Sequence, residues 1–517
     1  MKYTVVSSAE FTYPDVFEYQ TSSQAADLFA CRGSYASAQI LFSGLTSEAM
    51  PVSFKGLPHG VEAEVYTLKA IPVEKNIDIP DEKKKLHYPE RVAPFYVYDC
   101  FKTYDGTVEL TEGVGGVYIA LKIGDRCESG EYSLSVVCAD TEIPAVLKVY
   151  SARLPKSTLK MVNQYARWLA SQYHNVPMGT PEFEKLDSQH LALMKRMHQT
   201  MSYVSNPVCR DLGDNKYEFD FTNLKKELEK LESYGVTYYT GASIGWRKSW
   251  QESTIMIHGF PAMSYEAYLY LEQYLNAMRT FIKENGLLDR FYLGVADEPN
   301  GKNCIEYRAL CGMIKSIAPE LKLYDATGMS QLYGALDIYI PLNETYQRNR
   351  DEFEFVKSRG AELWFYVCCG PRGTGETQPY INRFMDYPLL STKYLHWGNY
   401  KYDLTGYLHW AFNFYQPGQD PFVQSCPEHH NTDSVCYLPA GDTNIVYPGT
   451  DGPWMSARLE AQRESAEDYE LLKFVASTDK DLADSICDSV FHSFCDVEYD
   501  AKKYIAAKKK LLEAASK

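Results

Sequence analysis

The stretch FYLGVADEPN, residues 291–300, joins a short apolar run directly to two carboxylates. Its first six residues have the composition of a strand that is buried inside a sheet. Pro299 cannot donate a backbone hydrogen bond to a central ladder, so the strand is predicted to end at Asp297 and Glu298. Because burying an unpaired charge is costly, two adjacent carboxylates at this point need a specific reason.

Seven further runs have the same apolar character, and amphipathic helical segments lie between most of them. The eight runs cover residues 161–168, 200–207, 235–243, 290–297, 322–328, 336–341, 362–369 and 406–415. Strands that alternate with helices indicate parallel β/α units, and eight units over about 300 residues fit a closed (β/α)8 TIM barrel. Residues 329–335 are too few for a full helix, so one crossover is predicted to be reduced. A doubly wound open sheet is the alternative, but it usually has a glycine-rich turn after its first strand, and residues 166–174 contain no glycine.

The chain has 517 residues, which is too long for a single hydrophobic core. Residues 1–155 contain short alternating runs separated by Gly, Pro and Asp, and this pattern predicts an antiparallel β-sandwich. The barrel is assigned to residues 156–477, and residues 478–517 are predicted to form a helical C-terminal tail. The predicted fold class is therefore multidomain, β followed by α/β. The charged segment 80–92 is predicted to be a solvated loop.

The composition excludes several classes of partner. The formal net charge of −16 disfavours nucleic acid and an anionic membrane surface. No segment approaches the ~18 apolar residues of a membrane-spanning helix. The first twenty residues contain no apolar run, and the 13 cysteines are odd in number and scattered. We therefore expect no secretory signal, reduced thiols and a cytoplasmic protein.

One group of side chains suggests a metal. Cys426, His429, His430 and Cys436 lie within eleven positions and are residue types that bind zinc. Their spacing matches no familiar zinc finger, so we predict a loop or a pocket rim instead. The sequence predicts no metal and no other cofactor.

In a barrel, the functional site lies where the strands end. The predicted strand ends carry Arg167, Trp168, Asn206, Trp246, Asp325, Asn343, Glu344, Tyr366, Trp410, Asn413 and Tyr415, in addition to Asp297 and Glu298. This set of carboxylates, amides and aromatic rings contains no lysine, so it suits a neutral, hydroxyl-rich ligand better than a phosphate. The flat faces of Tyr and Trp suit sugar rings.

The carboxylate pair predicts acid catalysis. Neighbouring carboxylates raise each other's pKa, which keeps one of them protonated near neutral pH. A protonated carboxyl group can act as the general acid that protonates a glycosidic oxygen. The alternative interpretation is a helix N-cap with acidic residues in its first turn. Adjacent strand residues point to opposite faces, so Asp297 and Glu298 can both reach one sugar only if the backbone leaves strand geometry here.

Several motifs resemble glycoside hydrolase family 123 and its uncharacterised relatives. They are DEP after the fourth strand, ELWFYVCCGP (362–371), GYLHWAFNFY (406–415), YPGTDGPWMSARLEAQRESAEDYELL (447–472) and, near the N-terminus, CRGSYASAQILFSG (31–44). The resemblance covers about residues 30–475. It implies a retaining exo-β-N-acetylhexosaminidase, similar to a β-N-acetylgalactosaminidase, that acts on a small glycan or glycoside.

In that family the 2-acetamido oxygen of the sugar itself attacks the anomeric carbon. By this resemblance, Asp297 orients and stabilises the acetamido nitrogen while an oxazoline forms. Glu298 protonates the leaving oxygen and later activates water. Such substrate-assisted enzymes are exceptions to the usual glycosidase scheme, in which two protein carboxylates act on the sugar.

The other members of the site follow from the same resemblance. Trp410 is predicted to be the aromatic floor under the reacting sugar, although a core tryptophan is the alternative. Tyr366 is predicted to hydrogen-bond the acetamido carbonyl, and Asn413 and Trp168 to bind hydroxyls or line the pocket. Arg458 is predicted to be structural, pairing with acids of its own helix or supporting the loop before it.

Two alternatives remain open. In the first, Glu298 works with a separate nucleophile or base, Asp325 or Glu344, and a carboxylate separation of roughly 5 Å or roughly 6.5–9.5 Å would distinguish a covalent retaining route from an inverting one. In the second, the chain is a carbohydrate-binding protein without catalysis. The sequence predicts neither the sugar nor the oligomeric state.

Overall fold

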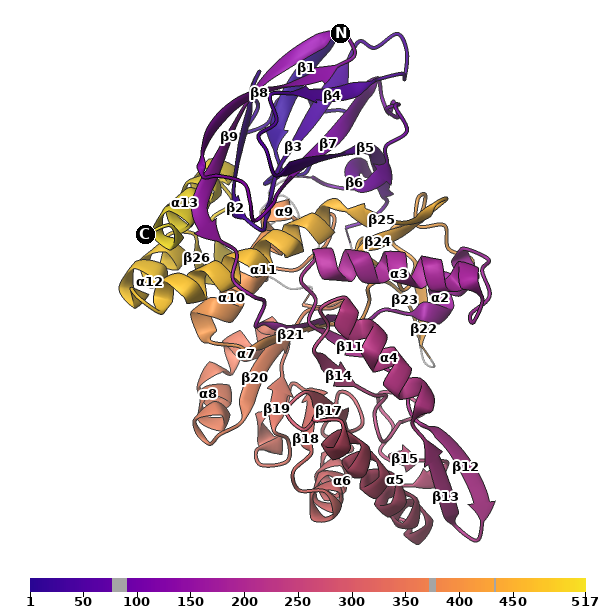
Figure 1. The fold of residues 1–517 in the computed structure, drawn as a ribbon. Coiled ribbons are helices and arrows are strands. Elements are labelled where there is room, and N and C mark those ends of the chain that lie inside the picture. The colour runs from indigo at the N-terminus through magenta and orange to yellow at the C-terminus, as the bar shows by residue number, and fades with distance from the viewer. Residues whose placement is uncertain (77–90, 372–377, 432–433) are drawn as a thin grey trace.

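The computed structural model describes residues 1–76, 91–371, 378–431 and 434–517. Figure 1 shows two N-terminal β-sheets at one end and a ring of short parallel strands at the other, with helix α11 (Ala457–Ala476) crossing between them. Most of the charged segment 80–92 falls outside the described residues.

The N-terminal region contains two sheets with a shared core. The larger has the order β1-β3-β7-β5-β6-β25-β24, and the smaller has the order β2-β9-β8-β4. Ile40 and Ile119 of the larger sheet share a core with Val136 and Leu147 of the smaller one, as in a sandwich. The strands are β1 (Lys2–Ser7), β2 (Ala26–Arg32), β3 (Tyr35–Ser43), β4 (Val52–Lys55), β5 (Val61–Val73), β6 (Phe95–Thr103), β7 (Val114–Ile123), β8 (Gly130–Cys138), β9 (Thr141–Arg153), β24 (Val446–Gly449) and β25 (Gly452–Ser456).

The prediction of antiparallel N-terminal sheets is confirmed with one exception. Strands β2 and β9 pair in parallel, whereas the other neighbours in these two sheets are antiparallel. A second difference is that β25 pairs with β6, with Met455 opposite Phe101. Residues 446–456 therefore return to the N-terminal sheet from within the segment that the sequence assigns to the barrel.

Eight parallel strands form a nearly closed barrel. They are β10 (Lys160–Asn163), β11 (Met201–Tyr203), β14 (Tyr238–Thr240), β17 (Phe291–Gly294), β18 (Lys322–Ala326), β19 (Ile338–Ile340), β20 (Glu362–Tyr366) and β21 (Gly406–His409). Their spatial order is β10-β21-β20-β19-β18-β17-β14-β11, which follows the chain around a ring. Each of the eight predicted apolar runs overlaps one of these strands, and only β10 extends beyond its run, by one residue.

Side chains rather than a backbone ladder bridge β10 and β11, the two ends of this order, among the residues that the structure describes. The amide of Gln199 accepts from the N–H of Asn163 at 3.0 Å and donates to the carbonyls of Asn163 at 3.2 Å and Met201 at 3.0 Å. The hydroxyl of Thr200 donates to the Leu159 carbonyl at 2.5 Å. A buried amide and hydroxyl thus supply the hydrogen bonds that a neighbouring strand would otherwise provide.

Helices connect successive strands of the barrel. They are α2 (Arg167–Tyr173), α3 (Pro181–Arg196), α4 (Thr222–Ser233), α5 (Tyr265–Glu284), α6 (Cys304–Ile317), α7 (Asn343–Arg348), α8 (Arg350–Ser358), α9 (Leu389–Lys393) and α10 (Leu395–Tyr402). Between β18 and β19 there is only a short 3-10 turn, η1 (Ser330–Leu332), so the predicted reduced crossover is confirmed. The hydroxyls of Thr180 and Ser264 accept hydrogen bonds from the first turns of α3 and α5, which fixes where these helices begin.

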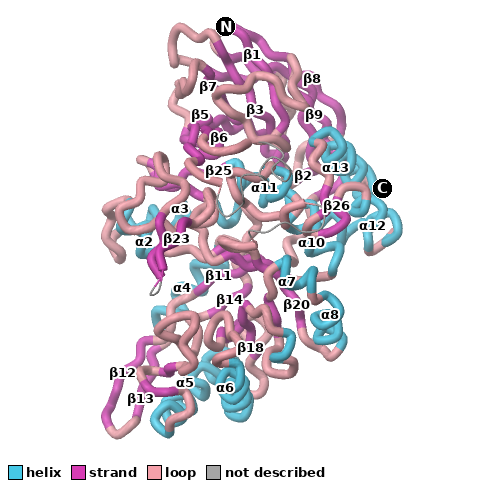
Figure 2. Tube along the Cα trace, turned by 180° about the vertical axis from the view of Figure 1, so that it is seen from behind, coloured by secondary structure: helices cyan, strands magenta, loops and turns pink. Residues whose placement is uncertain are grey.

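The described residues also form four short hairpins outside the two N-terminal sheets and the barrel. They are β12 (Val208–Gly213) with β13 (Lys216–Asp220), β15 (Met256–Ile257) with β16 (Phe260–Pro261), β22 (Glu428–Asn431) with β23 (Ser434–Tyr437), and β26 (Phe491–Ser493) with β27 (Asp496–Val497). Figure 2 shows the β12–β13 hairpin projecting from the barrel end of the molecule, as it also does in Figure 1.

Three C-terminal helices complete the chain: α11, α12 (Lys480–Asp488) and α13 (Ala501–Ala515). Helix α11 is enclosed, because 17 of its 20 residues are buried. Its charges are paired inside the protein, as in the 2.7 Å contact between Arg463 and Glu467. Arg458 is structural, as predicted, but its carboxylate partner is Asp99 of β6, at 2.8 Å, rather than an acid of its own helix. No helix among the described residues is long and apolar enough to cross a lipid bilayer.

Candidate active site

Asp297 and Glu298 follow β17 at the carboxyl end of the barrel strands. Their φ angles are +45° and +38°, so two consecutive residues have left-handed backbone. Such angles cost a residue other than glycine about 1 kcal/mol or more. The chain therefore leaves strand geometry at the point where both carboxylates would otherwise point to opposite faces. The helix N-cap interpretation is wrong, because α6 begins later and its N-cap is Asn303.

Asp325 of β18 supports this turn from the neighbouring strand. Its Oδ2 accepts hydrogen bonds from the N–H of Val295 at 3.1 Å, the N–H of Ala296 at 2.9 Å and the hydroxyl of Tyr307 at 2.6 Å. The residue is 4% exposed, and burial raises the pKa of its carboxyl to about 6. Asp325 is thus a buried acceptor for the backbone that leads into the carboxylate pair.

Arg247 lies in the loop between β14 and α5. It binds the backbone carbonyl groups of the same turn. Its guanidinium donates to the carbonyls of Asp297 and Glu298, the latter at 3.1 Å, and to the carbonyl of Trp250 at 3.0 Å. Asn300 also donates to the Trp250 carbonyl, at 2.7 Å. The DEPN segment and the loop that carries Arg247 are therefore fastened to each other.

Tyr366, at the end of β20, contacts Glu298 directly. Its hydroxyl donates to Oε1 of Glu298 at 2.6 Å, and the residue is 7% exposed. Burial raises the pKa of this hydroxyl, and the charges of Glu298, Cys368 and Asp297 raise it further. Of the two carboxylates, Glu298 is therefore the one that Tyr366 holds by a direct hydrogen bond.

Asp297 has an unusual pKa for an aspartate. Protein groups crowd its carboxyl although the residue is open to solvent on one side, and this partial burial raises the pKa. The charges of Asp325 and Glu298 raise it further and Arg247 lowers it, which gives a pKa of about 7. Adjacent carboxylates are expected to produce such a shift, and here it falls on Asp297.

Trp410 and Trp168 share an aromatic neighbour that was not predicted from the sequence. Phe414 lies 5.0 Å from Trp410 and 6.3 Å from Trp168, measured between ring centroids. The indole N–H of Trp410 donates to Oδ1 of Asp442 at 3.1 Å, which fixes the plane of the ring. Trp168 is half exposed, so it offers a ring face to solvent. The signal for Phe414 is present in the motif GYLHWAFNFY, where it stands four residues after Trp410.

Asn413 has a different environment from the one predicted. Its side chain is fully buried, accepting from the N–H of Ala166 at 2.8 Å and donating to the Ala166 carbonyl at 3.1 Å. The amide therefore holds the loop that leads into α2, which begins at Arg167. A direct contact between Asn413 and a ligand has no support in this geometry.

Glu344 and Asp325, the two carboxylates considered as a separate nucleophile or base, already have hydrogen-bond or ion-pair partners within the protein. Glu344 lies in the first turn of α7 and pairs with Arg348 at 2.8 Å. Asp325 uses one oxygen for three donors, as described above. The position of Asp325 within an apolar strand marks it in the sequence, but Arg247 and Tyr307 were missed because their roles depend on contacts between segments far apart in the chain.

The group of cysteines and histidines near residue 430 forms the β22–β23 hairpin. His429 stands opposite Cys436 in the strand register. Cys426 precedes the hairpin and is buried, and its thiol donates to the Lys75 carbonyl at 3.5 Å. This cysteine thus packs against the end of the N-terminal sheet.

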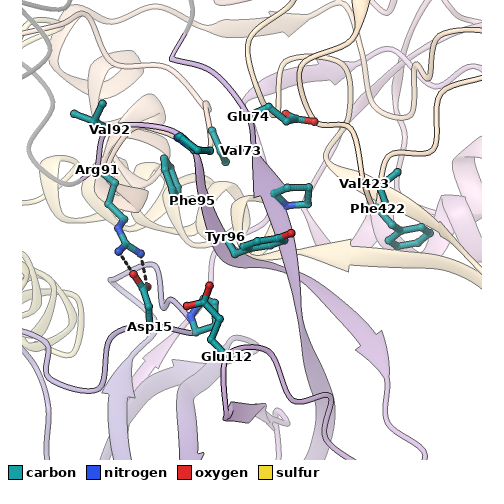
Figure 3. Close-up of a pocket in the computed structure, with 13 residues that line it drawn as sticks. Asp15, Val73, Glu74, Arg91, Val92, Phe95, Tyr96, Glu112, Phe422 and Val423 are labelled. Atoms are coloured by element: carbon teal, nitrogen blue, oxygen red, sulfur yellow. Dashed lines mark hydrogen bonds and ion pairs between the residues drawn. The ribbon is translucent and has the colours of Figure 1, made fainter.

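A separate hollow of about 550 Å³ lies where the N-terminal sheet meets the loop around Phe422. Figure 3 shows Tyr96 and Phe422 in its wall, with Arg91 paired to Asp15 at one end. None of the predicted site residues lines it. The carboxyl groups with raised pKa values that mark a candidate catalytic site, those of Asp297 and Asp325, lie at the carboxyl end of the barrel strands instead.

Comparisons with known proteins relate the chain to glycoside hydrolases. The family model for the glycoside hydrolase 123 catalytic domain matches residues 193–475, which is more than half of the chain and includes the DEPN turn. No curated protein sequence matches. The structure is similar to that of a family 123 glycoside hydrolase from Clostridium perfringens, studied for glycolipid glycan hydrolysis, with a TM-score of 0.73 and 13% identity over 99% of this chain and 97% of that chain.

A family 39 glycoside hydrolase from Bacteroides cellulosilyticus is a more distant structural match. Its TM-score is 0.38 at 11% identity, over 86% of this chain and 82% of that chain, which is too low to support an argument. The assignment therefore depends on the family model and on the fold shared with the Clostridium enzyme. The chain belongs to glycoside hydrolase family 123 and hydrolyses glycosidic bonds.

Proposed function

We propose that the enzyme is a retaining exo-β-N-acetylhexosaminidase, similar to a β-N-acetylgalactosaminidase, and that the 2-acetamido group of the substrate takes part in the reaction. The observation that carries the proposal is the left-handed turn at Asp297 and Glu298, with Glu298 hydrogen-bonded to the hydroxyl of Tyr366. Two carboxylates on consecutive residues can then serve two adjacent positions of one sugar.

In the proposed first step, Glu298 donates its proton to the glycosidic oxygen while the acetamido oxygen attacks the anomeric carbon. The bond to the leaving group breaks, the leaving group departs with the proton, and an oxazolinium forms. Asp297, ionised, accepts a hydrogen bond from the acetamido N–H and stabilises the positive charge that develops there. In the second step, Glu298 removes a proton from water, and the water oxygen attacks the anomeric carbon. This attack opens the oxazolinium ring, and the product keeps the anomeric configuration of the substrate.

The environment of Asp297 supports its part in this scheme. A pKa of about 7 leaves Asp297 partly ionised near neutral pH, and the positive charge that develops on the acetamido group stabilises this ionised form. Trp410, held by Asp442, and the half-exposed Trp168 are the proposed sugar-contacting rings. Tyr366 already donates its one hydroxyl proton to Glu298. Its proposed role is therefore to orient the acid rather than to bind the acetamido carbonyl.

The alternative of a separate nucleophile or base has less support. Oδ2 of Asp325 is occupied by two backbone N–H groups and a tyrosine hydroxyl, and Glu344 is paired on α7. The alternative of a binding protein without catalysis does not stand, because the chain belongs to a family of glycoside hydrolases.

The test compares chromogenic glycosides with and without a 2-acetamido group. We expect cleavage of 4-nitrophenyl β-N-acetylgalactosaminide, inhibition by a thiazoline that mimics the oxazoline, and the β-anomer as the first product seen by NMR. The matching 4-nitrophenyl β-galactoside should be cleaved at least about 100-fold more slowly, because it lacks the internal nucleophile. Equal cleavage of the two glycosides, or the α-anomer as first product, would overturn the proposal.

A further inference from the structure

The left-handed backbone of the carboxylate pair needs support from its surroundings. Consecutive strand residues point to opposite faces, and the left-handed backbone of Asp297 and Glu298 takes this pair out of that alternation. Residues other than glycine keep such angles only where their surroundings over-determine them. Specific contacts in this fold must therefore maintain the turn.

Asp325 makes the first set of contacts, on the N-terminal side of the pair. One buried oxygen, Oδ2, receives the N–H groups of Val295 and Ala296 and the hydroxyl of Tyr307, at 2.6–3.1 Å. These bonds fix the two residues that immediately precede Asp297. Because water does not compete for this buried oxygen, the direction of the chain as it enters the turn is defined by Asp325.

Arg247 makes the second set, on the pair itself. Its guanidinium donates to the carbonyls of Asp297 and Glu298, and its own loop is fastened to the same segment by the bond from Asn300 to the Trp250 carbonyl. Two further bonds join these segments, from Lys302 to Gln251 at 3.0 Å and from Asn303 to the Glu252 carbonyl at 3.2 Å. Arg247 thus reaches the turn from a loop that cannot easily move away from it.

We propose that Asp325 and Arg247 are positioning residues that hold Asp297 and Glu298 in the left-handed turn, the first by accepting the N–H groups before the pair and the second by donating to the carbonyls within it. The inference rests on the proposed catalytic roles of Asp297 and Glu298 and deepens them. It assigns Asp325 to the backbone of the acid pair rather than to the anomeric carbon.

The two positioning side chains carry opposite charges, so replacing them should shift the pKa of Asp297 in opposite directions. Among the described residues, the groups that act on the charge of Asp297 come from six places: Asp325 on β18, Arg247 before α5, Tyr203 on β11, Tyr307 on α6, Tyr366 on β20 and Glu298 beside it. The charge of Asp325 raises the pKa of Asp297, and the charge of Arg247 lowers it. Asp325→Asn should therefore lower that pKa, and Arg247→Met should raise it.

The experiment measures kcat and KM of both variants from pH 4 to pH 9, on whichever glycoside the wild-type enzyme cleaves fastest. We expect kcat to fall about 10- to 100-fold with KM within about threefold, because a misplaced acid slows the chemical step more than it weakens sugar binding. The acidic limb of the kcat/KM profile should move to lower pH in Asp325→Asn and to higher pH in Arg247→Met. Arg247→Lys keeps the charge and one donor, so it should restore the wild-type limb and part of kcat.

Two matched controls have the same chemistry at other places. Asp337 also accepts a backbone N–H of β18, that of Leu323 at 2.7 Å, and Arg308 donates to the carbonyls of Gln331 and Tyr333 at 3.1 and 3.0 Å. Asp337→Asn and Arg308→Met should leave kcat and the pH profile unchanged.

Three outcomes would overturn the proposal. Loss of activity without any movement of the limb, or with movement in the same direction in both variants, would assign the two residues a merely structural role. Restoration of Asp325→Asn by azide, with a glycosyl azide as product, would identify Asp325 as a nucleophile. If Asp325→Asn does not fold, the Arg247→Met and Arg247→Lys pair carries the test, since Arg247 is partly exposed. The proposed function fails separately, if the wild-type enzyme does not prefer 2-acetamido glycosides.

Discussion

The hydroxyl of Tyr366 donates a hydrogen bond to Oε1 of Glu298 at 2.6 Å and so joins the ends of β20 and β17. The two residues are 68 positions apart in the chain and meet because parallel strands of a barrel end at the same face. An acid that is held by a rigid strand keeps its orientation toward the substrate. This contact therefore links the architecture of the barrel to the chemistry of the proposed reaction.

Tyr366→Phe removes this hydrogen bond and leaves the ring. We expect kcat to fall about 10-fold or somewhat more, because hydrogen bonds to charged groups contribute about 1.5–3 kcal/mol. KM and Tm should change little. The control is Tyr437→Phe, which removes a similar 3.1 Å bond to Glu428 on the β22–β23 hairpin. Equal kinetic effects of the two variants would contradict the role of Tyr366.

Glu298→Gln removes the proposed acid without changing its shape. We expect kcat/KM for an oligosaccharide to fall about 10²- to 10⁴-fold, the range of general acid–base catalysis. The loss should be smaller for a glycoside of a good leaving group such as 4-nitrophenol, since such a group needs less protonation. Glu344→Gln is the comparison, and a loss of the same size in that variant would favour the alternative in which a separate carboxylate acts.

Asp297→Asn should stabilise the folded protein in a pH-dependent way. The pKa of Asp297 rises from 3.8 to about 7 on folding, so between these values the folded chain keeps a proton that the unfolded chain has lost. The stability that goes with this proton is complete below pH 3.8 and is lost as the pH rises through about 7. Asparagine does not ionise, so Tm should rise by about 2 °C or more at pH 8 and by less at pH 5, while activity is lost. Equal changes of Tm at the two pH values would be inconsistent with this assignment.

Arg458→Met breaks the fully buried pair with Asp99 that joins α11 to the N-terminal sheet. Removing one partner leaves an uncompensated charge, so the free energy of unfolding should fall by about 3–5 kcal/mol. Urea denaturation measures it. Arg210→Met, which breaks an exposed pair with Glu218, should cost about 1 kcal/mol or less. A small effect at Arg458 would mean that the buried pair is not important for holding the two parts together.

Much of the barrel could be predicted because its evidence is local. The eight strands are short apolar runs, and periodicity alone separates them from the helices between them. The reduced crossover at η1 follows from the number of residues available. The carboxylate pair was also visible, since two charges after a buried strand such as β17 need an explanation.

Other features depend on contacts that no local pattern contains. Strand β25 looks like an ordinary loop next to the barrel, but its partner is β6, which lies far back in the chain. Asn413 has the residue type of a sugar-binding amide, and only the position of Ala166 shows that its hydrogen bonds are already used. Arg247 has the composition of a surface arginine, and its importance comes from two carbonyl groups about 50 residues away.

The pairing of β25 with β6 has a consequence for biosynthesis. Phe101 leaves the ribosome early, whereas its partner Met455 is translated 354 residues later. Until then, the edge of β6 has unpaired backbone groups, and such an edge can pair with other chains. We therefore expect the nascent chain to need protection of this edge, such as binding by a chaperone, until Met455 has been translated.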